Sequence, residues 1–206
     1  MSTVPNAPAA VRNRDAILQV IRTELYGKQQ VFEIGSGTGQ HAIHFAAALP
    51  ELTWQTSDLA DNHPAIHHWI SESGLANVLE PKFLDVSEAG ETAERYTAVF
   101  SANTSHIMNK SSVMDMVAYV SRSLLPNGKF LLYGPFRVGG RFNGDSNARF
   151  DQSLRAQDPS MGIRDLEWID DMAMLKGLVQ QRTYAMPANN LLVVWMRDEG
   201  EGNDTA

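Results

Sequence analysis

The sequence predicts a single α/β domain built on a doubly wound, seven-stranded and mostly parallel sheet. Segments with helical periodicity alternate with short apolar segments, and the first apolar segment, 31–34, leads through a glycine-rich turn into a helical pattern. Length and composition agree, because 206 residues with 43% hydrophobic side chains are enough for one core. We therefore expect a folded domain over 11–197, between a flexible lead over 1–10 and a flexible acidic tail over 198–206.

Each element follows from its local pattern. Apolar residues three and four positions apart indicate helices, and glycine ends two of them, near Gly27 and at Gly74, because it adopts left-handed backbone conformations without strain. The expected helices cover 16–25, 40–49, 63–73, 112–125 and 166–175. Short apolar runs indicate strands, which are expected over 31–34, 52–56, 81–84, 97–102, 129–133 and 191–196, with one more around Tyr184.

The turn at Gly35, Gly37 and Gly39 is the strongest indication of a ligand site. Three glycines let the backbone turn sharply and approach a ligand closely, and the following helix directs free N–H groups into the turn. A nicotinamide dinucleotide is one candidate, but its G-x-G-x-x-G fingerprint needs glycine or alanine where this chain has Gln40. The carboxylate of Glu33 would also repel a pyrophosphate and attract a cationic amino group. A tight turn without a ligand is the third interpretation.

The run from Val31 to Gly39 consists of two apolar residues, Glu33, another apolar residue and G-x-G-x-G. This pattern resembles motif I of the class I S-adenosylmethionine-dependent methyltransferases. The resemblance implies their Rossmann-like fold and S-adenosyl-L-methionine as the cofactor. It also implies that the glycines pass beneath the methionine and ribose of the cofactor, and that Glu33 faces its ammonium group.

Five further segments extend this resemblance over almost the whole chain. They are R-N-R at 12–14, S-A-N-T-S-H at 101–106, F-D-x-S-L-R at 150–155, G-I-R-D at 162–165 and M-P-A-N-N at 186–190. Together they resemble a methyltransferase-like family known as a domain of unknown function (DUF938, UPF0585-like). That resemblance implies a fold and a cofactor class but no substrate.

Polar residues that close the other strands are candidates for the same ligand, because ligands of such sheets bind at the carboxyl ends of the strands. Asp58 closes the second strand, where its carboxylate could accept hydrogen bonds from both ribose hydroxyls. Asp85 closes the third and matches the methyltransferase acid that binds the adenine amino group, with Val86 as an apolar wall. In the resembled family the segment after the fourth strand lies beside the reacting methyl group, so Asn103 or Ser101 could bind the methionine end. Arg14 could reach the cofactor carboxylate if the first helix closes over the site. Each aspartate could instead cap a helix or form a turn.

The polar segment 134–162 is too long for an ordinary connection and is a candidate lid or substrate loop. Within it, Asn147, Asp151 and Arg155 recur every four residues and would share a helix face. Arg155 could clamp a carboxylate or phosphate and Asp151 could act as a base, although a weak surface ion pair is the simpler interpretation. His106 is either a proton carrier beside the methyl acceptor or a histidine satisfied by a backbone carbonyl.

Composition excludes several other functions. A net charge of −7 argues against a general nucleic-acid binder, and the absence of cysteine excludes disulfides and thiolate chemistry. His63, His67 and His68 include a four-residue spacing, but they lack the H-E-x-x-H pattern, so we expect no metal. No apolar run could span a membrane and the first residues lack a signal-peptide pattern, so we expect a cytoplasmic protein. We expect its substrate to be a small molecule.

The sequence thus predicts an S-adenosylmethionine-dependent methyltransferase that transfers a methyl group to a small or medium acceptor by in-line displacement. The weaker candidates for the acceptor side are His106, Asp151 and Arg155. One alternative is a non-catalytic module that binds S-adenosylmethionine or S-adenosylhomocysteine. A less favoured one is an NAD(P)-dependent oxidoreductase. The acceptor and the oligomeric state stay open.

Overall fold

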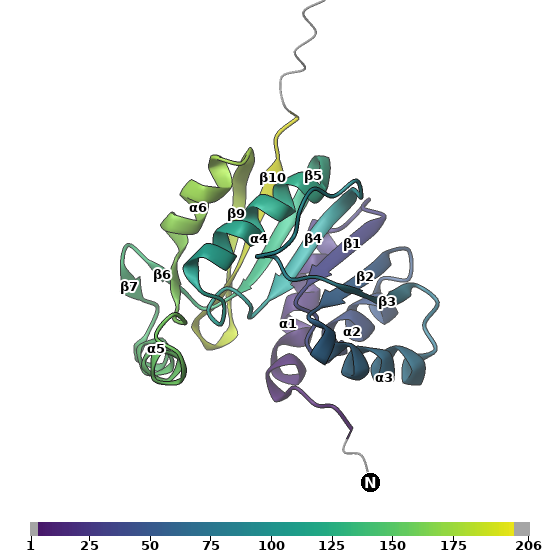
Figure 1. Ribbon diagram of the computed structural model, residues 1–206, viewed down its shortest axis with the longest axis horizontal. Coiled ribbons are helices and arrows are strands. Elements are labelled where there is room, and N and C mark those ends of the chain that lie inside the picture. The colour runs from purple at the N-terminus through teal and green to yellow at the C-terminus, as the bar shows by residue number, and fades with distance from the viewer. Residues whose placement is uncertain (1–3, 200–206) are drawn as a thin grey trace, which may run out of the picture.

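The computed structural model describes residues 4–199 of the chain, which contain six α-helices and ten strands (Figure 1). The helices are α1 (Pro8–Glu24), α2 (Gln40–Ala48), α3 (His63–Ser73), α4 (Lys110–Ser123), α5 (Asp145–Gln157) and α6 (Leu166–Met174), with the 3-10 turns η1 (Ala60–Asn62) and η2 (Pro187–Asn189). The strands are β1 (Gln30–Ile34), β2 (Thr53–Asp58), β3 (Val78–Phe83), β4 (Tyr96–Ala102), β5 (Leu124–Gly134), β6 (Phe136–Val138), β7 (Arg141–Phe142), β8 (Arg164–Asp165), β9 (Leu178–Met186) and β10 (Asn190–Arg197).

Seven strands form the main sheet in the order β3-β2-β1-β4-β5-β10-β9. The strands from β3 to β5 pair in parallel, whereas β10 runs antiparallel to its neighbours β5 and β9. The predicted doubly wound, seven-stranded and mostly parallel sheet in a single domain is therefore confirmed. The chain moves from β1 outward to β2 and β3 and then returns to β4 on the other side, so the carboxyl ends of β1 and β4 flank the crevice where ligands of such sheets bind.

Helices cover both faces of the sheet, with α1, α2 and α3 on one face and α4 and α6 on the other (Figure 1). Successive residues of β1 point to opposite faces, so Val31 lies in the core with Ile17 of α1 and Phe45 of α2, whereas Phe32 lies in the core with Val117 of α4. Strands buried on both faces need apolar residues in succession, which is the pattern of the first apolar segment. Within the described part of the chain, none of the helices combines the length and apolar character needed to cross a bilayer.

The expected elements are found, and α3 begins and ends where predicted. Two boundaries differ because of proline. β3 begins at Val78, before Pro81, because β3 is an edge strand in which the missing N–H of proline is tolerated. α4 ends at Ser123 and β5 begins at Leu124, earlier than expected, because a residue that precedes proline, here Pro126, favours extended backbone.

α1 begins at Pro8, which is earlier than the end of the predicted flexible lead, so that boundary is wrong. Proline suits the first turn of a helix because it has no N–H to leave unpaired. The residues before the helix are also held: the N–H of Ala7 donates to Oε1 of Gln40 at 2.6 Å, and Nε1 of Trp69 donates to the carbonyl of Pro5 at 2.8 Å. Residues 5–7 are therefore attached to α2 and α3.

The segment 134–162, predicted as a lid or substrate loop, contains regular structure. β6 and β7 form a hairpin, β8 pairs with β6 to complete a three-stranded sheet, and α5 follows β7. α5 includes the run 146–155 in which a short helix was expected. The predicted tail over 198–206 lies outside the described residues apart from its first two, so its flexibility stays a prediction.

Candidate functional site

A cavity of about 630 Å³ lies at the carboxyl ends of β1, β2, β3 and β4, where the topology predicts a ligand site. We call it the glycine-turn cavity, because the turn after β1 forms one wall and the residues after β2, β3 and β4 form the others. Six residues that the sequence proposed for a cofactor line it: Gly35, Gly37, Asp58, Asp85, Val86 and Asn103.

The turn from β1 to α2 uses glycine for two different reasons. Gly35 has a φ of +72°, and a Cβ there would lie 2.5 Å from Cγ2 of Thr104, so a side chain would strike the segment after β4. Gly37 has a φ of +60°, but a Cβ there would meet no atom within 4 Å. Gly35 thus permits close packing of the backbone, and Gly37 borders open space in the cavity.

Asp58 is the last residue of β2 and is 8% exposed. Its Oδ2 accepts a hydrogen bond from the N–H of Gly37 at 2.6 Å, and its Oδ1 accepts from the N–H of Leu59 at 2.7 Å and from Nδ2 of Asn62 at 2.8 Å. These bonds hold the carboxylate against the glycine turn. A carboxylate has about four acceptor positions, so Asp58 can organise this turn and still accept from a ligand hydroxyl.

Asp85 also combines a turn with a place in the cavity wall. Its Oδ1 accepts from the hydroxyl of Ser87 at 2.6 Å and from the N–H of Ser87 at 2.9 Å, and these hydrogen bonds lower the pKa of Asp85. The neighbouring Val86 is 7% exposed and belongs to the core beneath α4. An ionised acceptor therefore lies beside an apolar surface, an arrangement that suits a planar ligand carrying an amino group.

Glu33 does not line the glycine-turn cavity. The alternation of β1 directs its side chain to the α2 face, where it is 1% exposed and its Oε2 accepts from Nε1 of Trp54 and from the hydroxyl of Ser36, both at 3.0 Å. Burial raises the pKa of Glu33 to about 7; the two hydrogen bonds oppose this and the charge of Asp58 adds to it. The resemblance implied that Glu33 faces the ammonium group of the cofactor. The structure instead places its side chain behind the glycine turn, outside the glycine-turn cavity.

Gly39 and Arg14 also lie outside this cavity. Gly39 precedes α2 with a φ of +84°, and a Cβ there would lie 3.2 Å from Cα of Ile66, so this glycine lets α2 approach α3 closely. Arg14 lines a recess between the helices α1, α2 and α3, together with His44 and Trp69. Because Arg14 does not line the glycine-turn cavity, the structure does not place it beside the carboxylate of a cofactor bound there.

A second cavity, of about 650 Å³, adjoins the first and extends toward α5. We call it the α5 cavity. Aromatic rings and amide side chains predominate in its wall, with one arginine from α1. Its lining residues are Ala9, Arg12, Asn13, Asn103, His106, Tyr133, Pro135, Ser146, Asn147, Phe150, Pro187, Ala188 and Asn190.

Asn103 lines both cavities and marks the boundary between them. Its φ is 60°, a left-handed conformation that asparagine tolerates better than most residues, and its N–H donates to the carbonyl of Tyr133 at 2.8 Å. Gly134 lies close to both side chains, because a Cβ there would lie 4.0 Å from Oδ1 of Asn103 and 3.8 Å from Nδ1 of His106, which are ordinary contact distances. Strained backbone conformations of this kind gather at functional sites.

His106 is 5% exposed, and its ring lies edge-on to Phe150 with 5.2 Å between the ring centres. Burial, assisted by the charge of Arg164, lowers the pKa of His106 to about 4, so the imidazole is neutral at pH 7. Its Nδ1 is buried and has no hydrogen-bond partner in the described part of the chain. Nδ1 of His106 therefore does not bond a backbone carbonyl within residues 4–199, contrary to one of the two interpretations of this residue. Buried polar atoms without a partner are rare in proteins, so this atom is a candidate for a contact with a ligand.

Asp151 and Arg155 line neither cavity. Asp151 is 6% exposed, and its two oxygens accept from the N–H of Ile163 and from Nε of Arg155, both at 2.7 Å. The guanidinium of Arg155 packs on Gly162, where a Cβ would lie 2.5 Å from its Nη2. The pair therefore attaches α5 to the segment before β8, a stronger role than that of a surface ion pair.

Several residues of the α5 cavity were not identified from the sequence as site residues. Arg12 and Asn13 come from α1, and Oδ1 of Asn13 lies 2.7 Å from Nε2 of His41, which connects α1 to α2. Ala188 comes from η2, and Asn147 was identified only as part of a helix face. The R-N-R and M-P-A-N-N segments were the available signals, but they do not reveal which segments meet in space.

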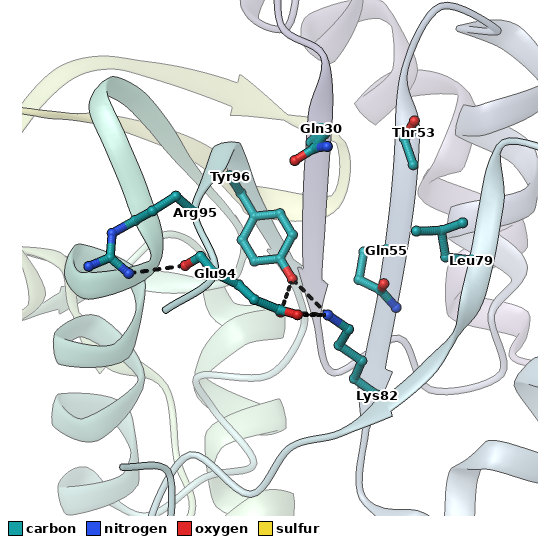
Figure 2. Close-up of a pocket in the computed structure, with 8 residues that line it drawn as sticks. All are labelled: Gln30, Thr53, Gln55, Leu79, Lys82, Glu94, Arg95 and Tyr96. Atoms are coloured by element: carbon teal, nitrogen blue, oxygen red, sulfur yellow. Dashed lines mark hydrogen bonds and ion pairs between the residues drawn. The ribbon is translucent and has the colours of Figure 1, made fainter. Parts of the chain in front are cut away.

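A third cavity, of about 270 Å³, lies along the face of β1, β2 and β3 beside the start of β4 (Figure 2). Residues 84–95, which connect β3 to β4, form no helix there. Figure 2 shows Lys82, Glu94 and Tyr96 converging in this cavity. The hydroxyl of Tyr96 donates to Oε2 of Glu94 at 2.6 Å, and Lys82 forms an ion pair with the same carboxylate. Because these polar groups satisfy one another, we assign no ligand to this cavity.

Residues 4–197 match the family described as "Protein of unknown function (DUF938)". The chain belongs to the DUF938 family. The family resemblance stated from the sequence motifs is therefore confirmed. In this DUF938 protein, residues 4–199 contain no group of three or more histidine, aspartate or glutamate side chains that could hold a metal ion.

Solved structures similar to the DUF938 protein include methyltransferases. An O-methyltransferase family protein from Burkholderia thailandensis is 16% identical with a TM-score of 0.72, over 91% of this chain and 59% of that one. The S-adenosylmethionine-dependent methyltransferase SibL is 18% identical with a TM-score of 0.78, over 92% and 55%. The YcgJ protein from Bacillus subtilis is 16% identical with a TM-score of 0.72, over 90% and 100%.

These similarities establish the fold of the DUF938 protein. The match covers 59% of the Burkholderia thailandensis protein, 55% of SibL and 100% of YcgJ, so this chain spans less than two thirds of the length of the first two proteins. The fold is thus the Rossmann-like class I methyltransferase fold that the sequence resemblance implied.

Proposed function

We propose that this protein binds S-adenosylmethionine in the glycine-turn cavity and transfers its methyl group to a small or medium acceptor in the α5 cavity. The observation that carries the proposal is the position of Asn103, which lines both cavities at the carboxyl edge of the sheet. A cofactor and an acceptor in the two cavities would meet at this residue. The methyltransferases among the structural neighbours share this fold and support the cofactor class.

The residues present fit the cofactor. Open space borders Gly37, Asp58 offers a carboxylate to ribose hydroxyls, and Asp85 with Val86 offers an acceptor and an apolar surface to the adenine. When bound, S-adenosylmethionine supplies a sulfonium methyl group that is transferred by displacement. The protein then contributes chiefly alignment and exclusion of water, since such a reaction needs the acceptor atom in line with the breaking bond.

The α5 cavity suits a polar acceptor of moderate size. The neutral ring of His106 can accept or donate a hydrogen bond at the acceptor atom, and amide side chains such as Asn147 can orient polar groups. Arg12 adds one cation at the wall contributed by α1. We therefore propose His106 as the group nearest the acceptor and give Asp151 and Arg155 no catalytic role.

Calorimetric titration with S-adenosylmethionine, S-adenosylhomocysteine and NADH tests the cofactor. We expect saturable binding of the first two, weakened roughly tenfold or more by Asp58→Asn, because a charged hydrogen-bond acceptor is lost. Glu33→Gln is the matched comparison, and it should leave affinity nearly unchanged because Glu33 lies outside the cavity. Equal weakening by both variants would return Glu33 to the cofactor site, and binding of NADH alone would overturn the proposal.

Turnover separates the enzyme from a non-catalytic module. Release of S-adenosylhomocysteine should be followed with hydroxyl, amine, thiol and carboxylate acceptors, in the wild type and in His106→Gln. The module is favoured by one observation, namely that only one of the three predicted catalytic residues lines the α5 cavity. Tight binding of both cofactor forms without product from any acceptor class would support the module.

A further inference from the structure

A small pocket separate from both cavities contains four cationic side chains. It has a volume of about 110 Å³ and lies between the first residue of α4, the strands β6 and β8, and the end of α5. We call it the basic pocket. Its charged and aromatic lining consists of Lys110, Arg137, Arg155, Arg164, Asp165 and Trp168, none of which lines the glycine-turn cavity or the α5 cavity.

Carboxylates compensate only part of the positive charge. Arg137 pairs with Asp165 at 2.5 Å and Arg155 pairs with Asp151 at 2.7 Å. Four cations thus face two carboxylates, which leaves two positive charges in a chain whose net charge is −7. A local field of this sign in an acidic protein favours a bound anion.

Arg164 and Lys110 are the cations that have no carboxylate partner within residues 4–199. Arg164 is 3% exposed and donates to backbone carbonyls, and Nζ of Lys110 lies 5.6 Å from the centre of the Trp168 ring. Burial lowers the pKa of Arg164. The charge of Arg155 lowers it further, the charge of Asp151 opposes this, and the charge of Arg137 adds to the lowering. The three guanidinium groups therefore repel one another, and an anion among them would relieve that repulsion.

Two buried polar atoms of side chains that line the basic pocket lack partners in the described part of the chain. They are Nε of Arg137, a donor, and Oδ1 of Asp165, an acceptor. A ligand that satisfies both must accept and donate hydrogen bonds. Inorganic phosphate meets this requirement because its hydrogen phosphate form keeps one proton near neutral pH, whereas sulfate has none to donate to Asp165. A phosphate monoester, whose second pKa is about 6, keeps its proton only in part. The carboxylate therefore selects between two anions of the same shape.

The volume of the pocket limits the part of a ligand that can enter it. Sites for drug-sized ligands have volumes of about 300–1,000 Å³, so 110 Å³ suits a single tetrahedral anion. We propose that the basic pocket binds phosphate, either as the free ion or as the phosphoryl group of a larger molecule. This site does not depend on the methyltransferase function, because it is built from different residues and needs no cofactor.

Arg164 also connects the basic pocket to the α5 cavity. Its Nε donates to the carbonyl of Ser105 at 3.2 Å, and its Nη2 donates to the carbonyl of Met108, so its contacts bracket His106. An anion that holds Arg164 in place would also hold this segment. Phosphate is therefore expected to reduce the amide hydrogen exchange of residues 105–108.

Proton–nitrogen correlation spectra give a local readout of binding, since the chain has four tryptophans and the Trp168 indole signal can be identified with Trp168→Phe. Inorganic phosphate, sulfate and chloride are titrated at equal ionic strength and pH. We expect phosphate to shift the Trp168 signal saturably and sulfate to bind at least several-fold more weakly. Glycerol 3-phosphate distinguishes the sources: tighter binding than inorganic phosphate assigns the site to the phosphoryl group of a larger molecule, and weaker binding assigns it to the free ion.

Two variants test the assignment without disturbing the core. Lys110→Ala changes an exposed residue and should weaken phosphate binding roughly tenfold, whereas Lys176→Ala, an exposed lysine outside the pocket, should not. Asp165→Asn should reduce the preference for phosphate over sulfate. Equal shifts with all three anions, or unchanged phosphate affinity in Lys110→Ala, would overturn the proposal. An unchanged preference in Asp165→Asn would overturn the phosphate assignment.

Discussion

Glu33→Gln should make the stability of this protein less dependent on pH. The carboxyl group of Glu33 is 1% exposed and its Oε2 accepts from Trp54 and Ser36. Burial raises its pKa from 4.5 to about 7 in the folded state. The amide oxygen of glutamine can accept the same two hydrogen bonds, so the substitution removes the titration and keeps the packing.

The sign follows from the raised pKa of this acid. Below pH 4.5, Glu33 is protonated in both the folded and the unfolded chain, and its stabilising contribution is complete. Between pH 4.5 and about 7, the unfolded chain releases the proton and the folded chain keeps it, so stability falls as pH rises. At about 1.4 kcal/mol per pKa unit, the loss reaches ~3 kcal/mol above pH 7.

Urea unfolding of the wild type and Glu33→Gln, followed by circular dichroism from pH 5 to pH 8.5, measures this loss. The free energy of unfolding of the variant minus that of the wild type should rise by up to ~3 kcal/mol over this range. Glu51→Gln, which changes an exposed carboxylate, is the control and should show a nearly constant difference. A difference for Glu33→Gln that does not change with pH would refute the argument that burial keeps this group protonated.

Three further substitutions should lower the free energy of unfolding, measured by urea denaturation. Gly35→Ala introduces a Cβ 2.5 Å from Cγ2 of Thr104 at a left-handed position, and should cost ~2–4 kcal/mol. Lys129→Met removes the cation that pairs at 2.7 Å with Glu24, which is 3% exposed, and should cost ~2 kcal/mol by leaving a buried carboxylate poorly paired. Asp151→Ala removes the acceptor of a buried backbone amide and should cost ~2–3 kcal/mol.

Each of these variants has a matched control. Gly37→Ala occupies open space at another left-handed position and should cost only ~1 kcal/mol. Lys176→Met removes an exposed lysine, and Gln152→Ala changes an exposed residue of α5; both should stay within ~0.5 kcal/mol of the wild type. Losses as large in the controls as in the test variants would contradict the contacts invoked for them.

Local pattern was sufficient for most of the fold. The apolar run of β1, the glycine turn and the start of α2 were predicted because strand and helix periodicity and left-handed glycines are properties of neighbouring residues. The positions of Asp58 and Asp85 in one cavity also followed from the sequence. Parallel strands bring their carboxyl ends to one edge, so residues that close different strands must meet there.

Tertiary packing decided in which direction other candidate side chains point and which groups they bond. The sequence placed Glu33 next to the glycine turn, but α2 and Trp54 enclose its carboxyl group on the far side. It placed Asp151 and Arg155 on one helix face, but the amide of Ile163 converts that pair into an attachment of α5. Each outcome depends on a partner that is distant in sequence.

Sequence patterns alone were enough to predict the fold class and the family, and they indicated the edge of the sheet at which the candidate cofactor residues meet. Tertiary packing was needed to show that α1 and η2 help to line the α5 cavity, that Asn103 lines two cavities, and that cations from α4, β6, α5 and β8 share the basic pocket. The two kinds of information differ in the distance along the chain over which the underlying interactions act. Backbone propensity and periodicity act between neighbours, whereas burial, charge and unpaired hydrogen bonds at a site depend on segments that folding brings together.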